Sequence, residues 1–444
     1  MGRTYLRAAC VALAMSVAGL FAANIGTSVA ALSLTADRVS ALPPKQQAAW
    51  RAYLDRSARQ KQVDQATLAA ELKTAGLAEP LNPPTGFSTR GMPLDRPTEW
   101  YAGAEARRVA DIIVSFQTPA GGWSKNLNLT DHVRRKGEHF AGNNLSRFLD
   151  STDFDLPHDP KWNYVGTLDN DATNTELQFL ARVVAALGPN AAAPCRASFL
   201  RGVDYLLAAQ FPNGGWPQVW PLEGGYHDAI TFNDDAVGQT LRLLNGVAGG
   251  KGIFAFVPAN VRKLAAGAVT RGVQCILAAQ IVENGRPTVW GQQHDPLTLR
   301  PVAGRNYEPA ALCSAESTGL VIFLMDLPKP GPRVVNAVEA AIAWFRKTAI
   351  HGVTYARGPD GGRLLPSADA PPTWARFYEI ASDRPIFGDR DKSIHDNLEE
   401  LSRERRMGYR WYGPGPQAAL DAYAKWSVRH AGNDPGAAGR VPGP

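Results

Sequence analysis

The sequence feature that most constrains the fold is a short motif that recurs three times. In each copy a helix-like run of small and apolar residues ends in glutamine, a tight turn follows, and a tryptophan comes after the turn. The copies run from Ala110 to Trp123, from Leu206 to Trp216 and from Ile276 to Trp290. A diverged recurrence at this scale is typical of stacked supersecondary units. Because the unit is helix–turn–helix, the sequence predicts paired helices around a shared core, as in a helical toroid or a solenoid.

A doubly wound parallel sheet fits this pattern poorly. Short β-branched runs do not alternate with helices, and no Gly-x-Gly-x-x-Gly motif opens a helix. The glutamine, glycine and tryptophan residues of the turns can serve the architecture alone. For Trp216 and Trp290 an architectural role and a place in a binding site are both open.

Residues 1–30 are predicted to be a secretory signal peptide. Arg3 and Arg7 form a short positive segment, an apolar stretch runs from about Ala8 to Ala23, and Ser28-Val29-Ala30 fits the small-x-small cleavage pattern. A core helix or a membrane anchor is the alternative, but the segment is short for a spanning helix. We therefore expect a secreted protein, extracellular or periplasmic, that has no membrane contact after the leader is removed.

Composition narrows the class of protein. Of the 444 residues, 45% are hydrophobic and 20% are charged, which excludes disorder over the whole chain. Four cysteines are too few for a small disulfide scaffold. Once Cys10 leaves with the leader, Cys195, Cys275 and Cys313 allow at most one disulfide, whose pairing the sequence leaves open. The net charge of +6 suits an acidic partner but lacks the dense basic patch typical of nucleic-acid binding.

The mature chain divides into three parts. Residues 31–94 are predicted to be a helical extension and a linker, with Pro43-Pro44 at a helix start and a Pro-, Gly- and Thr-rich stretch from Leu81. Residues 95–428 carry the repeat and the polar segments. Residues 429–444 are rich in Gly, Pro and Ala, and we expect them to be disordered.

Two acidic segments precede apolar helical runs. They are Asp169-Asn170-Asp171 and Asn233-Asp234-Asp235. An Asp or Asn at a helix start can be an N-cap, but a cap does not need three consecutive oxygen-bearing side chains, twice. Hard cations prefer such carboxylate and amide oxygens. No EF-hand spacing is present, so a calcium site would be assembled from separate segments.

Three arginines lie in loop-like, aromatic-rich sequence. For Arg305, Arg376 and Arg390 a salt bridge to a nearby acid (Glu308, Glu379 or Asp389) is the plain alternative. A guanidinium also grips a planar carboxylate with two hydrogen bonds. A carboxylate-bearing ligand would satisfy both these arginines and a bound cation, and aromatic side chains could then support sugar rings. These features point to a polymer of uronic acids.

A 4-linked uronate can be cleaved without water, by β-elimination. The C5 proton lies next to a carboxyl group, and a cation on that carboxylate acidifies the proton and stabilises the enediolate. A base takes the proton, and the glycosidic oxygen leaves C4. Arginine is an unusual base because its free pKa is above about 12, so alkaline conditions would favour it.

At these segments the sequence resembles the family-ten pectate lyases, over roughly residues 95–425. The matching stretches are Gln117 to Asn126, Thr167 to Glu176, 214–218, Asp228 to Ala236, Arg305 to Glu308 and Arg376 to Asp391. The resemblance implies an all-α fold, an (α/α) toroid of paired helices with a long substrate groove and some short strands in loops. It also implies a calcium cofactor and a polygalacturonate substrate. We expect a monomer that binds no nucleic acid.

The resemblance also implies roles for individual residues. Asp235 matches a calcium ligand, and Asp169 matches an acid that helps hold calcium or the substrate carboxylate. Arg305 matches the base. The substrate-binding positions are Arg376 and Arg390, for galacturonate carboxylates, and, in the groove, Lys125, Asn126 and Asn170. Asp234, which precedes Asp235 in the same segment, is predicted to be a further metal ligand.

Some residues depart from the family pattern. Ser124 stands where proline is expected, Asn306 where a small residue is expected, and Asp171 adds an acid. These departures put fine substrate preference in doubt. His227 can line the site or lie behind it.

Three other functions stay open. The first is another polyuronate lyase. The second is an inverting glycoside hydrolase, in which Asp169 and Asp235 would be the two carboxylates. The third is a secreted uronate-binding protein without turnover, which would not need Arg305 in the same site.

Overall fold

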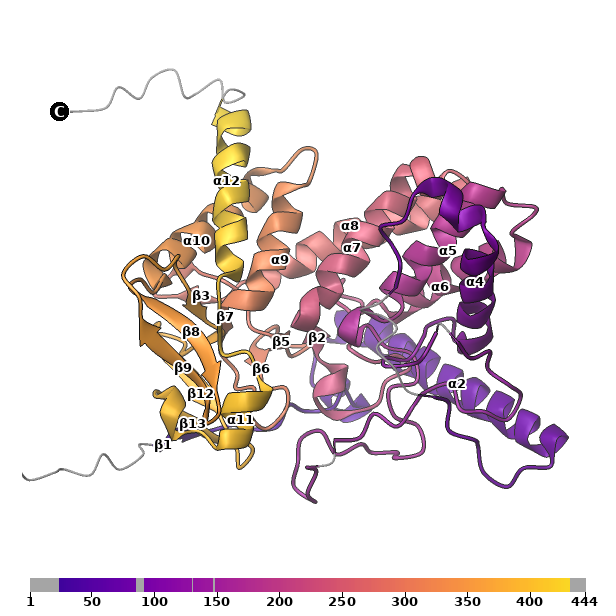
Figure 1. Cartoon of the computed structure of the whole chain (residues 1–444), viewed down its shortest axis with the longest axis horizontal. Coiled ribbons are helices and arrows are strands. Elements are labelled where there is room, and N and C mark those ends of the chain that lie inside the picture. Colours follow the sequence, from indigo (N-terminus) through magenta and orange to yellow (C-terminus); the bar gives the residue numbers. More distant parts are fainter. Residues whose placement is uncertain (1–23, 85–91, 130, 147, 432–444) are drawn as a thin grey trace, which may run out of the picture.

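The computed structural model describes residues 24–84, 92–129, 131–146 and 148–431, and helices dominate it (Figure 1). The α-helices are α1 (Ala36–Ser40), α2 (Pro44–Ala75), α4 (Ala104–Phe116), α5 (Asn174–Leu187), α6 (Ala193–Ala209), α7 (Ala236–Gly249), α8 (Ala259–Ala279), α9 (Ser314–Met325), α10 (Pro332–Thr348), α11 (Arg403–Gly408) and α12 (Gly415–Ala431). Helix α5 packs on α6, α7 packs on α8, and α9 packs on α10 and α12. The predicted helical character is confirmed.

Short strands lie in the connections, as predicted. An antiparallel five-stranded sheet has the order β1 (Asn24–Thr27), β13 (Ser393–His395), β12 (Pro385–Gly388), β11 (Phe377–Tyr378) and β7 (Leu312–Cys313). The smaller sheets pair β2 (Ile230–Thr231), β5 (Gln293–His294) and β6 (Pro301–Val302); β3 (Val282–Glu283) and β4 (Arg286–Pro287); β8 (Val353–Gly358) and β9 (Gly361–Pro366); and β10 (Trp374–Ala375) and β14 (Tyr412–Gly413). Most of these strands are too short to give a readable alternation of residue types.

The glutamines of the repeated motif tie alternate helices together. Gln117, just after α4, donates through Nε2 to Gly121 O in its own turn and to Ser198 O of α6, both at 2.8 Å. Gln210 makes the same two bonds to Gly214 O and to Ala268 O of α8 at 2.9 Å. Gln280 bonds to Thr288 O at 2.9 Å and to Ala337 O of α10 at 3.0 Å. One side chain per repeat therefore closes a turn and ties the helix before it to the next helix but one.

The tryptophans of the motif are fully buried. The indole Nε1 of Trp123 donates to Ile113 O at 2.8 Å, that of Trp216 to Leu206 O at 2.8 Å, and that of Trp290 to Ile276 O at 2.7 Å. All three side chains have no exposed surface. Trp216 and Trp290 thus serve the architecture, which settles the question that the sequence left open.

After α10, a fourth tryptophan makes the same hydrogen bond from its indole to a helix carbonyl. Trp374 donates to Phe345 O at 2.8 Å and is also fully buried. The sequence did not indicate this copy, because Ala349 stands at the glutamine position and the β8–β9 hairpin separates the helix from its tryptophan.

We predict that Gln210→Leu destabilises the protein by about 2–4 kcal/mol, since two buried carbonyls lose their donor. Arg271, whose Nη2 donates to Gln210 Oε1 at 2.5 Å, also loses its acceptor. The shift in urea midpoint, followed by far-ultraviolet circular dichroism, measures this effect. Gln417→Leu, at an exposed i,i+4 contact with Asp421, is the matched control and should change stability by less than about 0.5 kcal/mol. Equal shifts of the urea midpoint in the two variants would contradict a stabilising role for the two Gln210 hydrogen bonds.

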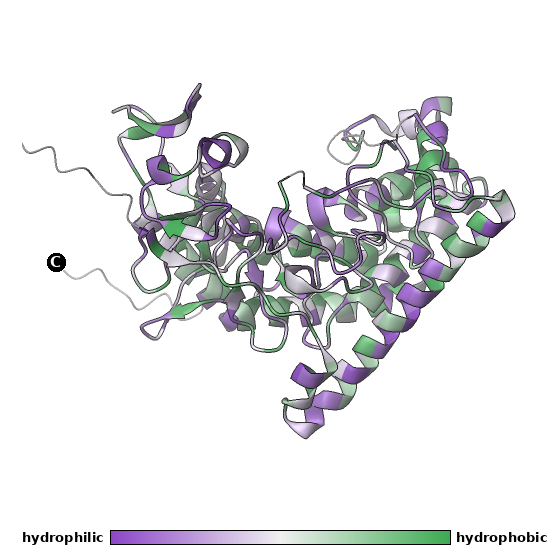
Figure 2. Cartoon of the chain, turned by 90° about the horizontal axis from the view of Figure 1, so that it is seen from below, coloured by the Kyte–Doolittle hydropathy of each residue, from purple (hydrophilic) through white to green (hydrophobic). Residues whose placement is uncertain are grey.

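The N-terminal extension packs on the repeat through α2. Pro44 is at the first helical turn, as the sequence predicted. Tyr53 is fully buried and its hydroxyl donates to Ala209 O at 3.0 Å, while the Trp50 and Phe211 rings lie 5.5 Å apart. Figure 2 shows α2 as a long helix of mixed hydropathy along one edge of the molecule.

Several expectations concern the chain ends and surface. Residues 1–23 of the predicted leader lie outside the described residues; residues 24–27 form β1, which pairs with β13. Helix α12 continues to Ala431, into the segment expected to be disordered, and residues 432–444 lie outside the described residues.

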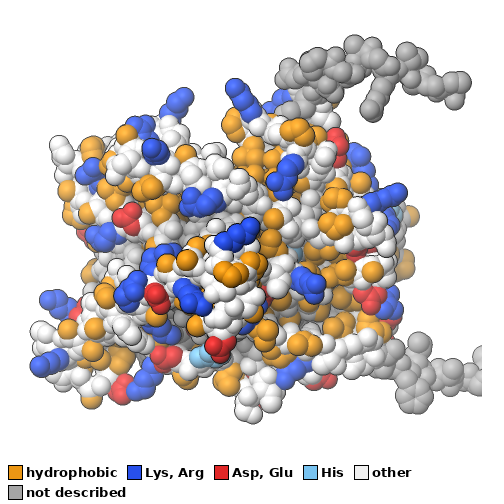
Figure 3. Space-filling model, turned by 180° about the vertical axis from the view of Figure 1, so that it is seen from behind, with side chains coloured by type: hydrophobic (Ala, Val, Ile, Leu, Met, Phe, Trp, Pro, Cys, Tyr) orange, Lys and Arg blue, Asp and Glu red, His pale blue; other side chains and the backbone are white. Residues whose placement is uncertain are grey.

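Cys195, Cys275 and Cys313 are buried and unpaired. On the face drawn in Figure 3, basic side chains are scattered rather than gathered. Within the described ranges, no helix has the length and apolarity needed to cross a bilayer.

Candidate active site

Two similar turns place the acidic segments at the starts of α5 and α7. The short 3₁₀ helix η2 (Asp169–Asp171) precedes α5, and η4 (Asn233–Asp235) precedes α7. The middle residues, Asn170 (φ 52°) and Asp234 (φ 50°), adopt the left-handed conformation that Asn and Asp tolerate better than most residues. Neither α5 nor α7 has a side-chain N-cap bond, so the simple capping role does not apply.

These turns form the floor of a polar cavity, which we call the Asp169 cavity. Its volume is about 160 Å³. It is lined by Lys125, Asn144, Ser146, Asp155, Tyr164, Asp169, Asn170, Gln218, Tyr226, Asn233, Asp234, Gln292, Gln293, Arg305 and Glu308. The structure thus gathers five predicted site residues here: Lys125, Asp169, Asn170, Asp234 and Arg305.

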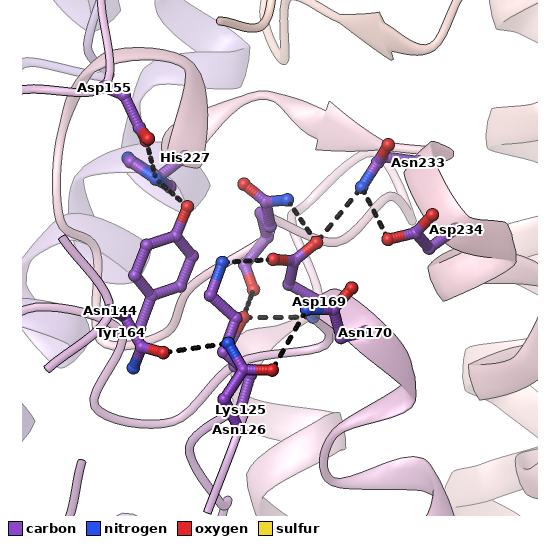
Figure 4. Close-up of polar contacts among 12 residues, drawn as sticks. Lys125, Asn126, Asn144, Asp155, Tyr164, Asp169, Asn170, His227, Asn233 and Asp234 are labelled. Atoms are coloured by element: carbon purple, nitrogen blue, oxygen red, sulfur yellow. Dashed lines mark hydrogen bonds and ion pairs between the residues drawn. The ribbon is translucent and has the colours of Figure 1, made fainter. Parts of the chain in front are cut away.

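Asp169 is the centre of this cavity and is almost fully buried. Lys125 Nζ donates to its Oδ2 at 2.5 Å, while Gln218 Nε2 and Asn233 Nδ2 donate to Oδ1 at 2.9 and 3.1 Å (Figure 4). Burial alone would raise the pKa of Asp169, but the charge and hydrogen bond of Lys125 hold that pKa below its ordinary value. Asp169 is therefore ionised at neutral pH.

Asp234 is the second carboxylate of the cavity. Asn233 Nδ2 also donates to Asp234 Oδ2, at 3.2 Å, so one amide bridges Asp169 and Asp234. Burial, and then the charges of Asp169 and Glu316, raise the pKa of Asp234 to about 6. A cation bound between the two carboxylates would remove this repulsion.

The oxygen donors of the cavity fit a hard cation. Besides the two carboxylates, Gln218 Oε1 and Gln293 Oε1 are buried wall atoms that have no hydrogen-bond partner among the described residues. Carboxylate and amide oxygens are the ligands that Ca²⁺ prefers. No three His, Cys, Asp or Glu side chains of the described residues lie together as a metal site. The two carboxylates and these two amide oxygens are donors that the described wall offers to a cation.

Arg305 also lines the cavity and is held by Glu308. Its Nε and Nη2 donate to the Glu308 carboxylate at 3.1 and 2.6 Å, and its backbone N–H donates there at 2.9 Å. Burial raises and the Arg305 charge lowers the pKa of Glu308, with a net fall to about 2. The side chain of Arg305 is 37% exposed, so its guanidinium remains open to the cavity.

Two predicted arginines are occupied elsewhere. Arg376 forms an ion pair with Glu316 and lines neither this cavity nor the adjoining one. Arg390 donates to Glu404 at 2.9 and 3.1 Å, and it lines the adjoining cavity of about 270 Å³ together with Arg305 and Arg405. We call this second space the Arg390 cavity. The salt-bridge partners expected from the sequence, Glu379 and Asp389, are not the ones used.

Asp235, predicted as a metal ligand, does not line the Asp169 cavity. Its Oδ2 pairs with Arg242 at 2.5 Å, while Oδ1 is buried against Gly238 and Gly319. The carboxylate pair that the hydrolase alternative requires, Asp169 with Asp235, is therefore not assembled in one cavity.

Asn126 lies beside the cavity rather than on its wall. Its side chain donates to Asn144 Oδ1 at 3.1 Å and accepts from Asn170 Nδ2 at 3.4 Å. His227 lies behind the wall, with Nε2 at 2.8 Å from the Tyr164 hydroxyl and 3.7 Å from Asp155. Lys125 Nζ also sits 3.5 Å from the centre of the Tyr164 ring.

Sequence reasoning missed several wall residues. Tyr164, Asp155 and Asn144 come from residues 139–165, a segment without a readable motif, and Tyr226 was assigned no role. Gln218 and Glu308 were part of matching stretches but were given no role at the cavity. A run of Asp and Asn residues between 143 and 170 was the only available signal for this wall.

The helical repeat and a cavity that combines two carboxylates with Lys125 and Arg305 describe the class of enzymes that act on acidic polysaccharides. A family model described as pectic acid lyase matches residues 117–420. The chain belongs to the pectic acid lyase family, and its identification as a pectate lyase enzyme from the sequence motifs is confirmed.

Two solved structures are similar to this chain. A family 10 polysaccharide lyase from Cellvibrio cellulosa is 32% identical, with a TM-score of 0.63, over 76% of this chain and 97% of that chain. A single-residue mutant of a family 10 polysaccharide lyase from the same organism, in complex with trigalacturonic acid, is 32% identical, with a TM-score of 0.62, over 77% of this chain and 99% of that chain. Among curated proteins, none matches at the same level of significance.

Proposed function

We propose that this chain is a secreted pectate lyase that cleaves α-1,4-linked polygalacturonate by calcium-assisted anti β-elimination. The products would be oligosaccharides with 4-deoxy-4,5-unsaturated galacturonosyl non-reducing ends. The observation that carries the proposal is the meeting of Asp169, Asp234, Lys125 and Arg305 around one cavity in a chain of this family. The trigalacturonic acid bound to the similar lyase supports the substrate. The N-terminal pattern of residues 1–30 supports secretion.

We also propose that the repeat closes into an (α/α) toroid around a long groove. Support comes from the glutamine ties, which link α4 to α6, α6 to α8 and α8 to α10 in succession. The starts of α5 and α7 then meet at one end of the inner layer, where the positive ends of helix dipoles favour an anionic ligand.

The residues of the cavity have separable tasks in this proposal. Asp169 and Asp234 would hold Ca²⁺, which when bound neutralises the uronate carboxylate and acidifies the C5 proton. Lys125, within reach of Asp169, would bind a substrate oxygen. The substrate would first displace part of the contact between Arg305 and Glu308. The neutral form of Arg305 then takes the C5 proton. The C5–H bond breaks as Arg305 gains the proton, the C4–C5 double bond forms, and the bond from C4 to the glycosidic oxygen breaks. The departing oxygen takes its proton from water.

The appearance of ultraviolet absorbance from the unsaturated product tests this proposal. We expect polygalacturonate incubated with the mature protein at alkaline pH to gain absorbance in Ca²⁺ and to gain none in excess chelator, with recovery when Ca²⁺ is restored. New reducing ends without absorbance would identify a hydrolase instead. A flat trace in Ca²⁺, with a known lyase active in parallel, would refute the pectate proposal. Absorbance that only alginate elicits would point to another polyuronate.

A further inference from the structure

A third cavity lies between the N-terminal extension and the segment that forms one wall of the site. Its volume is about 290 Å³, larger than the Asp169 cavity. Glu79, Pro80 and Asn82 of the extension form one side, and residues between 139 and 163 form the other. We call it the Asn82 cavity. Glu79, Pro80 and Asn82 of the N-terminal extension therefore contribute surface beside the candidate active site.

The Asn82 cavity adjoins the Asp169 cavity. Asn144 lines both of them. A chain of amides leads from one to the other: Asn170 donates to Asn126 at 3.4 Å, and Asn126 donates to Asn144 at 3.1 Å (Figure 4). Ser146, Asp155 and Arg305 line both the Asp169 cavity and the Arg390 cavity. The Asp169 cavity thus shares wall residues with each of the other two, so a polymer held at Asp169 can reach either of them.

The Arg390 cavity and the Asn82 cavity differ in their cationic side chains. The Arg390 cavity carries three arginines, Arg305, Arg390 and Arg405, beside three acids, Asp153, Asp155 and Glu404. In the Asn82 cavity the charged wall residues are Glu79 and Lys161, and they neutralise each other through contacts of 3.0 and 3.2 Å. Because a uronate carboxylate is held by cationic donors, the Asn82 cavity, whose single cation is already paired, does not suit a charged sugar.

The remaining polar groups of the Asn82 cavity suit hydroxyl groups. They are amides, together with His139, whose ring nitrogens bond to Lys161 O and to the backbone of Ala141. Asn163 lines the cavity, is 7% exposed, and its Oδ1 has no hydrogen-bond partner among the described residues. A buried acceptor without a donor is costly, and a sugar hydroxyl could supply the missing donor.

We propose that the Asn82 cavity is a subsite for an uncharged sugar residue of the polymer being cleaved, either a methyl-esterified galacturonate or a neutral sugar. The proposal rests on the proposed lyase function and adds to it a preference for polymers whose charge is interrupted. The N-terminal extension is then part of substrate recognition, because it supplies one wall of the subsite.

Asn82→Arg in the full mature chain tests the subsite. Asn82 is exposed, and its side chain has no hydrogen-bond partner among the described residues, so the new arginine makes the cavity cationic without unfolding the wall. The measured quantity is the ratio of kcat/KM on partly methyl-esterified polygalacturonate to kcat/KM on unesterified polygalacturonate. We expect this ratio to fall roughly threefold to fivefold, the size of effect of one partly exposed charge. Asn190→Arg, at an exposed turn between α5 and α6, should leave the ratio unchanged.

The outcomes separate this proposal from the lyase function itself. Activity of the unmodified protein on unesterified polygalacturonate tests the function, and only the ratio tests the subsite. An Asn82→Arg ratio equal to that of Asn190→Arg would overturn the subsite while leaving the lyase intact. Mass spectrometry of the products distinguishes the two sugars: esterified product ends identify a methyl-ester subsite, and neutral-sugar ends from a branched pectin identify a neutral-sugar subsite. Product ends that are always free galacturonate would refute both.

Discussion

Replacing Arg305 with alanine is expected to lower kcat for elimination by about a thousandfold, in the range that loss of a general base produces. The cavity wall has two cationic side chains, and Lys125 is committed to Asp169 at 2.5 Å. Arg305 also pairs with a carboxylate, that of Glu308, but its side chain is 37% exposed against 12% for Lys125, so Arg305 is the more accessible candidate for the C5 proton. The fold should survive the change, because the Arg305 side chain is 37% exposed. Ultraviolet product formation at saturating substrate and Ca²⁺ measures kcat.

The pH dependence of kcat gives this prediction a second readout. Burial opposes the charge of Arg305, but the adjacent Glu308 carboxylate raises the pKa of the guanidinium well above its ordinary value. The neutral form of Arg305 is then scarce at neutral pH. As long as the pH is below that pKa, the neutral fraction increases tenfold for each unit by which the pH rises. We therefore expect kcat to rise through the alkaline range without reaching a plateau. Glu308→Gln removes the raising charge and should shift the rise to lower pH.

A matched arginine separates loss of the base from loss of charge. Arg384 is exposed and pairs with Glu379 and Asp396, and it lines none of the three cavities. Arg384→Ala should keep kcat within about twofold, as expected for an exposed ion pair. If Arg305→Ala retained kcat while Arg384→Ala also did, another group would have to be the base, and the tyrosines at 164 and 226 would be the next candidates.

The repeat could be recognised in the sequence because the glutamine and tryptophan of each copy bond to backbone groups close to them in the chain. Gln210 and Gly214 lie within one turn, and only glycine fits at 214: φ is 96°, and a Cβ there would lie 2.1 Å from Arg271 O. Pro44 marked the start of α2 for the same reason, since its ring acts on its own backbone. The fourth tryptophan escaped notice because 28 residues, including a hairpin, separate Phe345 from Trp374.

The site was readable in its composition but not in its geometry. The acidic segments and Arg305 were predicted, yet sequence could not tell which acid faces the cavity. Consecutive left-handed residues turn Asp234 toward Asp169 and Asp235 toward Arg242. The partner of Arg376 is Glu316, 60 positions away at the start of α9, whereas the alternative partner considered from the sequence was Glu379, three residues along the chain. Pairings of this kind depend on helix packing, which a local pattern does not contain.

Asp169→Asn is expected to lower kcat/KM by about two to three orders of magnitude, the range for loss of one fixed charge that stabilises a transition state. The substitution keeps the shape and the oxygen that accepts from Gln218 and Asn233. It removes the charge that pairs with Lys125 and one of the two carboxylates available to Ca²⁺. Since Asp234 would then be the remaining acid of the pair, the Ca²⁺ concentration for half-maximal activity should also rise.

Asp171→Asn is the matched control for this change. Asp171 belongs to the same turn, but its carboxylate accepts from Gln239 and does not line the cavity. An amide oxygen can accept that bond, so activity and Ca²⁺ dependence should stay within about twofold of the unmodified protein. Thermal unfolding of both variants checks that the lost Lys125 pair has not unfolded the turn. Asp169 lines the cavity and Asp171 does not. Equal shifts of the Ca²⁺ titration in the two variants would therefore show that the cation does not bind at Asp169.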